Sequence, residues 1–389
     1  MGETRKRVLV VAGEASGDIL GANMIKAAAE LDPSLRFYGV AGPRMEAAGC
    51  SVLRPSSELA VMGLVEVVRH LPRIWSVYRD IKRALQSNTE RTDVVVLIDS
   101  PDFNLRIARL AHKAGIPVLY YVSPQVWAWR RGRVHRIARD VDKLAAILPF
   151  EPEYYAGLDI DVRYVGHPLL DEARVKTPAG QVRAMHGLDR STPVIGLLPG
   201  SRANELHYSL PTMLEAAQLL TQRFPGVGFL LPVAAGVDPT QLHACVADSG
   251  LNVKLVDDTI YDTVAACDAV IAVSGTVTLQ TALVKTPMVI IYKGSALTYA
   301  IGKRLVSITH FGLPNIVAGR TVVRELLQQE ATAAAIAAEV QRIIEDTPYR
   351  MEMLANLEDI RTRMGTPGCA ERVVRMLQEL SQKGDFEER

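Results

Sequence analysis

Two short turns in the second half of the chain suit phosphate binding. Each follows an apolar run and precedes a helical pattern, and they consist of Gly200, Ser201 and Arg202, and of Ser274, Gly275 and Thr276. Small residues let backbone N–H groups approach a phosphate, and a helix beginning at such a turn attracts the anion through its dipole. Arg202 adds a guanidinium that can bind a diphosphate with two hydrogen bonds. A tight turn without a ligand is the alternative at either place, but two such turns in one half favour a phosphate site.

In the first half, the acidic loop Asp99–Asn104 suits acid–base chemistry. It reads DSPDFN and follows the apolar run VVVLI. Asp99, Asp102 and Asn104 can hold the hydroxyl of an acceptor, and Asp99 is the candidate base that removes its proton. Alternatively, Ser100 or Asp102 only caps the next helix.

The opening turn GEASGD, residues 13–18, adds polar side chains that we expect at the same sheet edge. Glu14 can orient an acceptor, with Ser16 beside it, whereas Asp18 can simply favour a helix start. The turn does not match the GxGxxG pattern, and this counts against a dehydrogenase. No GxxxxGK[ST] phosphate loop occurs in the chain.

A tryptophan-rich segment, Ser123–Arg131, suits an apolar ligand with an anionic head. Trp127 and Trp129 stand beside Arg130 there. Ordinary helix packing with a solvated basic face is the alternative.

The stretch from Leu59 to Ala84 combines many apolar residues with five cationic ones. Such a segment can place Met62 and Trp75 in a lipid interface while its cations pair with anionic head groups. A core helix has a similar pattern, but the number of apolar residues favours membrane contact.

Apolar, β-branched runs alternate with helical patterns along the chain, and this indicates parallel sheets covered on both faces. In the first half we expect strands at Val8–Ala12, Arg36–Val40, Val94–Ile98, Val118–Val122, Lys143–Leu148 and Val162–Val165. In the second half we expect them at Val194–Leu198, Gly228–Leu231, Val253–Val256, Ala269–Ala272 and Met288–Tyr292.

The alternation stops and restarts once, so we expect two Rossmann-like domains. The predicted boundaries are 1–168 for an acceptor and membrane-facing domain, 169–192 for a linker, 193–345 for a donor-binding domain, and 346–389 for helices that cross back to the first domain.

Composition limits the possible partners. The 389 residues exceed one ordinary core. With 44 Lys plus Arg against 43 Asp plus Glu the net charge is +1, which does not indicate a global polyanion-binding field, so no nucleic-acid partner is expected. The four cysteines form no CxxC pair and the eight histidines form no ligand cluster, so no metal is expected. Asp159-Ile160-Asp161 precedes a strand rather than following one, so we treat it as a surface feature. No apolar run approaches the ~18 residues of a membrane span.

Ten motifs together resemble the lipid-A-disaccharide synthases, in order from about residue 8 to residue 330. They are GEASGD, AGPRM, AVMGLVEV, DSPDFN, YVSPQVWAWR, LPFE, VGHP, LPGSR, SGTVTLQ and LPNIVAGR. The set is specific, although no single motif would be.

The resemblance implies a GT-B fold, with two Rossmann-like domains facing a cleft, and an inverting, metal-independent UDP-sugar glycosyltransferase. The implied substrates are UDP-2,3-diacylglucosamine and 2,3-diacylglucosamine 1-phosphate, which yield the β-1,6-linked lipid A disaccharide and UDP. Such an enzyme lies peripherally on the cytoplasmic face of the inner membrane. A homodimer is left open.

The resemblance also implies roles for individual residues. Asp99 matches the carboxylate regarded as the general base, and Glu14 matches the acidic residue of the first loop. Arg202 and the turn at residues 274–276 fall where the family holds the UDP diphosphate, and Asn315 matches a position near the donor. Gln280 stands where many sugar transferases have a ribose-binding Glu, and a glutamine there accepts with less charge.

Two rival enzymes share the expected fold and donor type: the muramyl-lipid N-acetylglucosaminyltransferase and UDP-sugar 2-epimerase. From another class, a non-catalytic nucleotide- or lipid-binding module would leave a diacyl donor and its acceptor unchanged.

Overall fold

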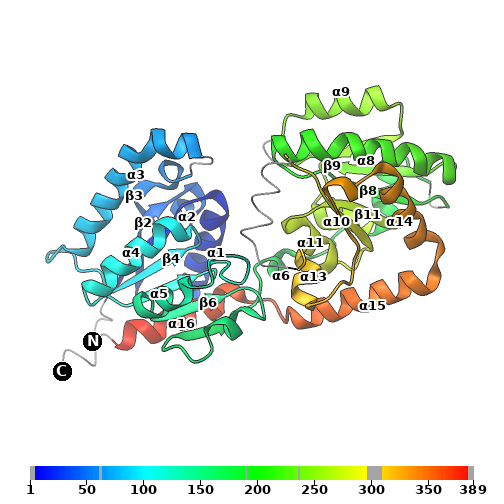
Figure 1. Cartoon of the computed structure of the whole chain (residues 1–389). Coiled ribbons are helices and arrows are strands. Elements are labelled where there is room, and N and C mark those ends of the chain that lie inside the picture. The colour runs from blue at the N-terminus through cyan, green and yellow to red at the C-terminus, as the bar shows by residue number, and fades with distance from the viewer. Residues whose placement is uncertain (1–4, 61–63, 190, 235–236, 296–308, 384–389) are drawn as a thin grey trace. The chain divides into compact units, whose positions relative to one another are not determined.

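The computed structural model describes residues 5–60, 64–189, 191–234, 237–295 and 309–383 and divides into two compact units (Figure 1). Unit 1 comprises Met1–Pro168 and Thr366–Arg389, and unit 2 comprises Leu169–Gly365. Each unit is built on one sheet whose paired strands are parallel. The prediction of two parallel-sheet α/β domains is therefore confirmed.

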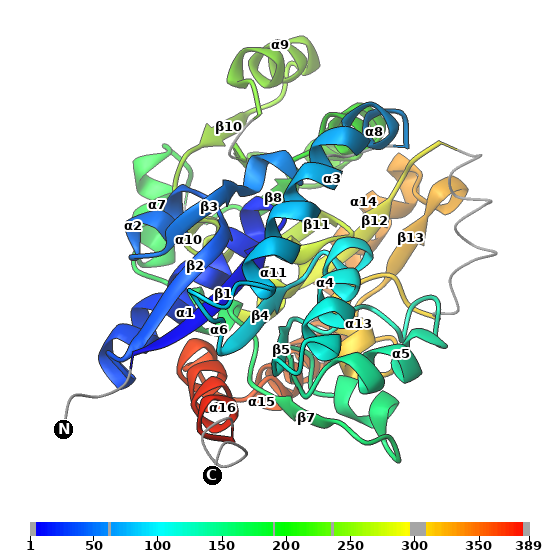
Figure 2. The same ribbon diagram turned by 90° about the vertical axis from the view of Figure 1, so that its left-hand side faces the viewer.

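The sheet of unit 1 has seven strands in the order β3-β2-β1-β4-β5-β6-β7 (Figures 1 and 2). The strands are β1 (Lys6–Ala12), β2 (Leu35–Ala41), β3 (Ser51–Pro55), β4 (Val94–Ile98), β5 (Val118–Tyr121), β6 (Lys143–Ala146) and β7 (Asp161–Tyr164). The order changes direction at β1 and β4, so the loops after these two neighbouring strands are where a ligand is expected to bind in such a sheet.

Helices cover both faces of the sheet of unit 1. They are α1 (Ala15–Leu31), α2 (Pro43–Ala47), α3 (Leu64–Leu85), α4 (Pro101–Lys113), α5 (Arg133–Asp140) and α16 (Cys369–Lys383). Successive side chains of a strand point to opposite faces. Thus Val8 and Val10 pack in the core with α1 and α16, whereas Leu9 and Val11 pack in the core with α3, α4 and α5.

Unit 2 has a six-stranded sheet in the order β10-β9-β8-β11-β12-β13. Its strands are β8 (Val194–Leu198), β9 (Gly228–Pro232), β10 (Val253–Val256), β11 (Ala269–Val273), β12 (Met288–Tyr292) and β13 (Glu325–Leu327). Its helices are α6 (Leu169–Glu172), α7 (Ala179–Met185), α8 (Ala203–Arg223), α9 (Pro239–Ser249), α10 (Ile260–Ala265), α11 (Thr276–Leu283), α13 (Leu313–Ala318), α14 (Ala333–Glu345) and α15 (Thr347–Arg363).

The sequence analysis missed β3 and β13. Both are edge strands. Most side chains of β3 are exposed, so β3 lacks the apolar run by which the other strands were predicted. The other eleven strands overlap runs that the sequence predicts.

The observed division differs from the expected boundaries in two places. The predicted linker, 169–192, belongs to unit 2, because α7 packs on α10 and the carboxylate of Asp262 accepts hydrogen bonds from the amides of Lys176 and Thr177. Only α16, and not α15, joins unit 1. Helix α15 packs against α11, α13 and α14, while α16 packs against α1.

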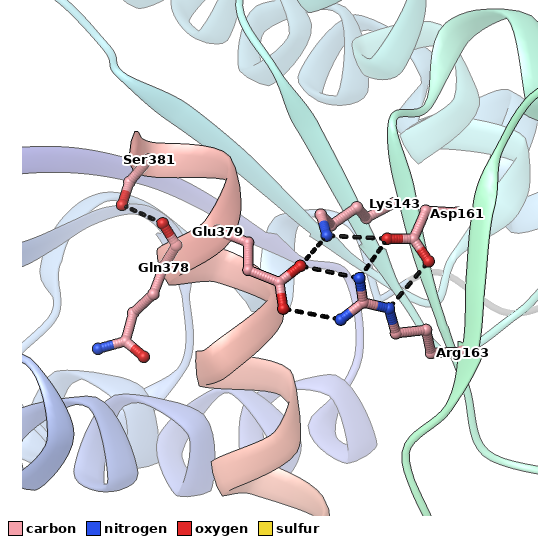
Figure 3. A network of polar contacts seen from close by, with 6 residues as sticks. All are labelled: Lys143, Asp161, Arg163, Gln378, Glu379 and Ser381. Carbon is pink, nitrogen blue, oxygen red and sulfur yellow. Dashed lines mark hydrogen bonds and ion pairs between the residues drawn. The ribbon is translucent and has the colours of Figure 1, made fainter. Parts of the chain in front are cut away.

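An ion-pair network attaches α16 to the sheet of unit 1 (Figure 3). Lys143 of β6 is 5% exposed, and its Nζ lies 2.8 Å from Asp161 Oδ2 and also contacts the carboxylate of Glu379. Arg163 of β7 bridges Asp161 and Glu379, with Nη1 2.8 Å from Glu379 Oε1. Asp161, which the sequence suggested was a surface feature, therefore helps to anchor the C-terminal helix.

Within the residues that the structure describes, no helix is both long and apolar enough to cross a membrane.

Candidate functional site

The carboxyl edge of the unit 1 sheet brings two polar turns into contact. The β1–α1 turn carries Glu14, and the β4–α4 turn carries Asp99 and Ser100. Gly13 lies so close to the second turn that a Cβ built on it would stand 2.5 Å from Ser100 Oγ. A larger residue would push the loops apart, so glycine allows Glu14 and Asp99 to share one edge. Ser16, in the first turn of α1, is exposed.

The carboxyl group of Asp99 has an environment that suits a base. Burial raises its pKa above the ordinary 3.8, and the charge of Glu14 raises it further, while a hydrogen bond with the backbone of Ser100 acts in the opposite direction. A higher pKa makes the carboxylate a stronger proton acceptor.

Strained backbone gathers at this edge. Asp99 and Ser100, which follow β4, have φ values of 50° and 45°, and Val122, which follows β5, has a φ of 73°. Left-handed φ values are uncommon outside glycine and are outliers for a β-branched residue such as valine. Strain of this kind persists where surrounding contacts impose it, and it concentrates at functional sites.

Two buried side chains hold the strained turn by its backbone. The hydroxyl of Tyr120 donates to the carbonyl oxygen of Asp99 at 2.6 Å, and Nδ2 of Asn104 donates to the same oxygen at 2.8 Å. Asn104 also donates to the carbonyl of Ile98 at 3.0 Å. Since Asn104 is fully buried, the structure shows no exposed surface for its predicted contact with an acceptor; its side chain holds the backbone of Asp99.

Asp18 connects two of the sequence motifs within unit 1. Its buried carboxylate accepts hydrogen bonds from the amides of Gly42, Arg44 and Met45, each at 3.0 Å. It thus caps the N-terminus of α2 and ties GEASGD to AGPRM.

Asp102 pairs with Arg130 of the tryptophan-rich segment and with Arg133, the first residue of α5. Its Oδ1 contacts Arg133 Nη2 and lies 3.6 Å from Arg130 Nη1. Both guanidinium groups stack on Trp129, with their Cζ atoms 4.4 Å and 5.2 Å from a ring centroid for Arg130 and Arg133 respectively. Asp102 therefore belongs to a cationic cluster with Arg130, Arg133 and Trp129, and its carboxylate is paired with these arginines.

Trp127 belongs to the core. It is 5% exposed, stacks edge-on against Phe150, and donates through Nε1 to Glu151 Oε1 at 3.2 Å. The structure thus gives Trp127 a packing role and shows almost no exposed surface for the predicted ligand contact. Glu151 also accepts from the amides of Ile147 and Leu148, and burial raises the pKa of its carboxyl to about 7.

The predicted lipid segment forms one wall of a groove. Trp75 of α3 is 63% exposed, and Met62 lies outside the described residues. The groove, of about 570 Å³, runs between α3 and α4. Its apolar wall includes Leu71, Ile74, Trp75, Tyr78, Phe103 and Leu110. Its cationic residues are Arg106, Arg109, Lys113 and Arg136.

In unit 2, the β8–α8 turn contains Gly200, Ser201 and Arg202. The amides of Ser201 and Arg202 donate to Glu205 Oε2 at 3.0 Å and 3.3 Å, and Arg202 Nη1 donates to Glu205 Oε1 at 2.9 Å. Gly200 has a φ of 99°, and a Cβ built on it would collide with Glu205. These two amides are therefore already hydrogen-bonded to Glu205. The side chain of Arg202 is 68% exposed, and its Nε and Nη2 atoms have no partner among the described residues.

The β11–α11 turn is partly occupied in the same way. Ser274 donates through its hydroxyl to the carbonyl of Phe311 at 2.8 Å and through its amide to Ile291 at 2.9 Å. Gly275 and Thr276, at the N-terminus of α11, are exposed. They leave this helix end open to an anion.

Asn315 has a structural task in this structure. It is fully buried, its Nδ2 donates to Val323 O and Glu325 Oε1, and its Oδ1 accepts from the amides of Val322 and Val323. Both hydrogen-bond donors and both acceptor positions of the Asn315 side chain are thus occupied within the protein, so none is left for the expected contact with the UDP-sugar.

The side chain of Gln280 donates through Nε2 to the hydroxyl of Tyr261 at 3.5 Å.

The sequence analysis missed three residues that shape these loops: Tyr120, Glu205 and Glu325. Glu325 accepts from the amides of Phe311 and Gly312, and so fixes the loop that receives Ser274. Glu205 had a usable signal, because it stands three residues after the N-cap Arg202, as in a capping box. Tyr120 and Glu325 lie within strands and had none.

In the described part of the chain, no three His, Cys, Asp or Glu side chains gather as a metal site would require.

Comparison with known proteins places the sequence. The family model described as lipid-A-disaccharide synthetase matches residues 8–371. The lipid-A-disaccharide synthase of Syntrophotalea carbinolica is 54% identical over 384 residues, covering 99% of this chain and 98% of that protein. The lipid-A-disaccharide synthase of Geobacter metallireducens is 48% identical, covering 96% of this chain and 97% of that protein.

Solved structures agree on the fold. The calicheamicin glycosyltransferase CalG4 has a TM-score of 0.62 at 16% identity, covering 97% of this chain and 98% of that chain. UDP-GlcNAc 2-epimerase from Neisseria meningitidis, bound to UDP-GlcNAc, has a TM-score of 0.59 at 14% identity, covering 96% of this chain and 100% of that chain. Transferases and an epimerase share this architecture, so the fold does not select between these reactions.

Proposed function

Because the chain belongs to the lipid-A-disaccharide synthase family, we propose a specific reaction for it and a role for each part of its site. The protein is a glycosyltransferase of lipid A biosynthesis with a GT-B fold. The family match separates it from the muramyl-lipid transferase and from the epimerase.

The proposed donor is UDP-2,3-diacylglucosamine and the proposed acceptor is 2,3-diacylglucosamine 1-phosphate. The 6′-hydroxyl of the acceptor attacks the anomeric carbon of the donor, the bond from that carbon to UDP breaks, and UDP leaves with the electron pair. One in-line displacement inverts the configuration and gives the β-1,6-linked disaccharide.

Asp99 acts as the general base that takes the proton of the attacking hydroxyl. The observation that carries this assignment is its position: a half-buried carboxylate in a strained turn at the switch point of the unit 1 sheet, next to Glu14. Glu14 raises the basicity of Asp99 by its charge and is exposed, so it can also bind an acceptor hydroxyl.

Unit 2 holds UDP and stabilises its charge as it leaves. Arg202 has exposed guanidinium nitrogens for the diphosphate, and the open N-terminus of α11 at Gly275 and Thr276 adds a favourable dipole. Gln280 is the proposed ribose contact. These groups take the part that a metal ion plays in other transferases, so the proposed reaction needs no metal or other cofactor.

The enzyme works against a membrane surface, which we propose is the cytoplasmic face of the inner membrane. The α3–α4 groove supports this, because its apolar wall suits acyl chains and its cations suit anionic head groups.

The test incubates the protein with both lipids and identifies the products by mass spectrometry. We expect the tetraacyl disaccharide 1-phosphate and UDP, with and without EDTA. Unchanged lipids would identify a binding module and refute the proposed reaction, and a strict requirement for Mn²⁺ would refute its metal-free form.

A further inference from the structure

Two arginines of unit 1 share one tryptophan. Arg130 and Arg133 both place their guanidinium groups against Trp129, at 4.4 Å and 5.2 Å from a ring centroid. Stacking on an indole fixes the orientation of a guanidinium and leaves its N–H groups free to point sideways. The pair is therefore organised before any ligand arrives.

The only acidic side chain paired with these arginines in the described residues is Asp102. A single oxygen, Asp102 Oδ1, accepts a hydrogen bond from Arg133 Nη2 and forms an ion pair with Arg130 Nη1 at 3.6 Å, so one negative charge faces two positive charges. Asp102 is 72% exposed and Arg130 is 56% exposed, whereas Arg133 is 16% exposed. A ligand can therefore reach the position that the Asp102 carboxylate occupies, and the cluster keeps an excess of one positive charge to attract it.

The cluster lies beside the proposed base. Asp102 follows Asp99 by three residues, in the first turn of α4. Burial raises the pKa of the Tyr120 hydroxyl. The negative charges of Asp99 and Asp102 raise this pKa further, and the positive charge of Arg133 lowers it. Because that hydroxyl donates to the carbonyl of Asp99, the cluster and the base surround the same buried group.

We infer that Trp129, Arg130 and Arg133 form a subsite for a phosphomonoester. This subsite holds the phosphate of the acceptor while Asp99 faces the attacking hydroxyl of the same acceptor. The inference rests on the proposed function. Two guanidinium groups can make paired hydrogen bonds to the oxygens of a dianionic phosphate, and these are stronger than those to a single carboxylate oxygen. Asp102 holds the arginines in place until the phosphate replaces it.

The test compares two acceptors, 2,3-diacylglucosamine 1-phosphate and the same lipid without the phosphate. In Arg130→Ala and Arg133→Ala, KM for the phosphorylated acceptor should rise about ten- to a hundredfold, the usual loss for a charged hydrogen bond. KM for the acceptor without the phosphate and KM for the donor should stay the same. Arg131→Ala is the matched control, because Arg131 is a neighbour in the same loop but faces Tyr154 at 6.0 Å.

The outcomes separate the subsite from its alternatives. An equal loss on both acceptors, or no loss, overturns the subsite. A fall in binding to phosphatidylglycerol vesicles without a change in acceptor preference would assign the arginines to the membrane, and it too overturns the subsite.

A direct measurement covers the case in which the wild-type protein transfers to neither acceptor, so that the proposed function itself has failed. Calorimetry with glucosamine 1-phosphate should still show binding to the wild type and to Arg131→Ala, but not to Arg133→Ala. Equal binding by all three proteins, or by none, overturns the subsite.

Discussion

At the scale of single residues, the conformation of Asp99 connects sequence to chemistry. An aspartate at φ 50° followed by a serine at φ 45° is an unfavourable turn, and each such residue costs about 1–3 kcal/mol. Tyr120 and Asn104 offset that cost by binding the carbonyl of Asp99. Two buried side chains therefore fix the backbone that carries the carboxyl group of Asp99.

Asp99→Asn should lower turnover by about 10²–10⁴-fold, the usual contribution of a general base, because an amide cannot take the proton of the hydroxyl. Binding of UDP, measured by calorimetry, should stay unchanged, since the residues that we propose bind the diphosphate belong to unit 2. Near-normal turnover in this variant would show that another group is the base.

The pH profile should report the same carboxyl group. Because burial and Glu14 raise the pKa of Asp99, the fraction of active carboxylate falls, as pH is lowered, earlier than for an ordinary aspartate. Glu14→Gln removes one cause of the raised pKa, so the acidic limb of kcat/KM should move to lower pH. A limb that stays in place would remove Glu14 from the site.

Tyr120→Phe tests the positioning of Asp99. Without the hydroxyl, the Asp99 carbonyl loses one of its two side-chain partners, so kcat should fall while KM for the donor stays the same. Tyr121→Phe is the control, because its hydroxyl contacts Cys369 on the other face of the sheet. A loss of stability with unchanged kcat would make Tyr120 purely structural.

The sequence revealed the types of these residues better than their surroundings. The places of Asp99, Glu14 and Arg202 could be predicted because they follow predicted strands, where a parallel sheet exposes its loops. The burial of Trp127, Asn104 and Asn315 was not predicted, because a polar or aromatic residue in a loop motif can be either exposed or buried. Burial depends on which loops meet, and spacing along the chain does not show this.

At the scale of elements, the β8–α8 turn is built around Glu205. Its carboxylate binds two turn amides and Arg202, so the turn keeps its shape without a ligand. The sequence predicted the turn but not this cap, and two amides expected to serve the diphosphate are already used. The exposed guanidinium of Arg202 is left as the charged group that we propose binds the diphosphate.

Arg202→Ala should weaken UDP binding about ten- to a hundredfold by calorimetry, as expected for loss of charged hydrogen bonds. Glu205→Ala should weaken it less, because it only frees Arg202 and the turn. If Glu205 acts through Arg202, its substitution should add little in the Arg202→Ala background. Tighter UDP binding in Glu205→Ala would instead show that the carboxylate competes with the diphosphate.

At the scale of the whole molecule, the alternation of strands and helices was enough to predict two parallel-sheet units. The path of the last helices was less accessible. Both α15 and α16 have polar and apolar positions, yet α15 remains with unit 2 while α16 buries Val373, Val374 and Leu377 in unit 1. Amphipathic patterns show that a helix packs, but not against what.

The Lys143–Asp161–Arg163–Glu379 network should contribute to stability above the acidic range. Hydrogen bonds from Arg163 and Lys143 lower the pKa of Glu379 from 4.5 to about 2. A carboxyl group whose pKa is lowered by folding stabilises the fold above its unfolded value, and this contribution is lost as pH falls towards the folded value.

Glu379→Gln should therefore reduce the free energy of unfolding at pH 7, by about 1 kcal/mol at most, because Glu379 is 45% exposed and water screens its charge. The difference from the wild type should shrink as pH falls below 4.5 in thermal melts. Glu371→Gln, on the same helix and outside the network, is the control. A difference independent of pH would exclude the charge of Glu379 as its cause.

The discontinuity of unit 1 has a consequence for biosynthesis. Residues 366–389 complete this unit but are translated after all of unit 2. A nascent chain thus carries an uncovered apolar face on α1 and β4 while unit 2 can already fold. A premature stop codon before α16 would leave that apolar face uncovered. Such truncated chains should be substrates for chaperones and proteases, even though every proposed catalytic residue is present.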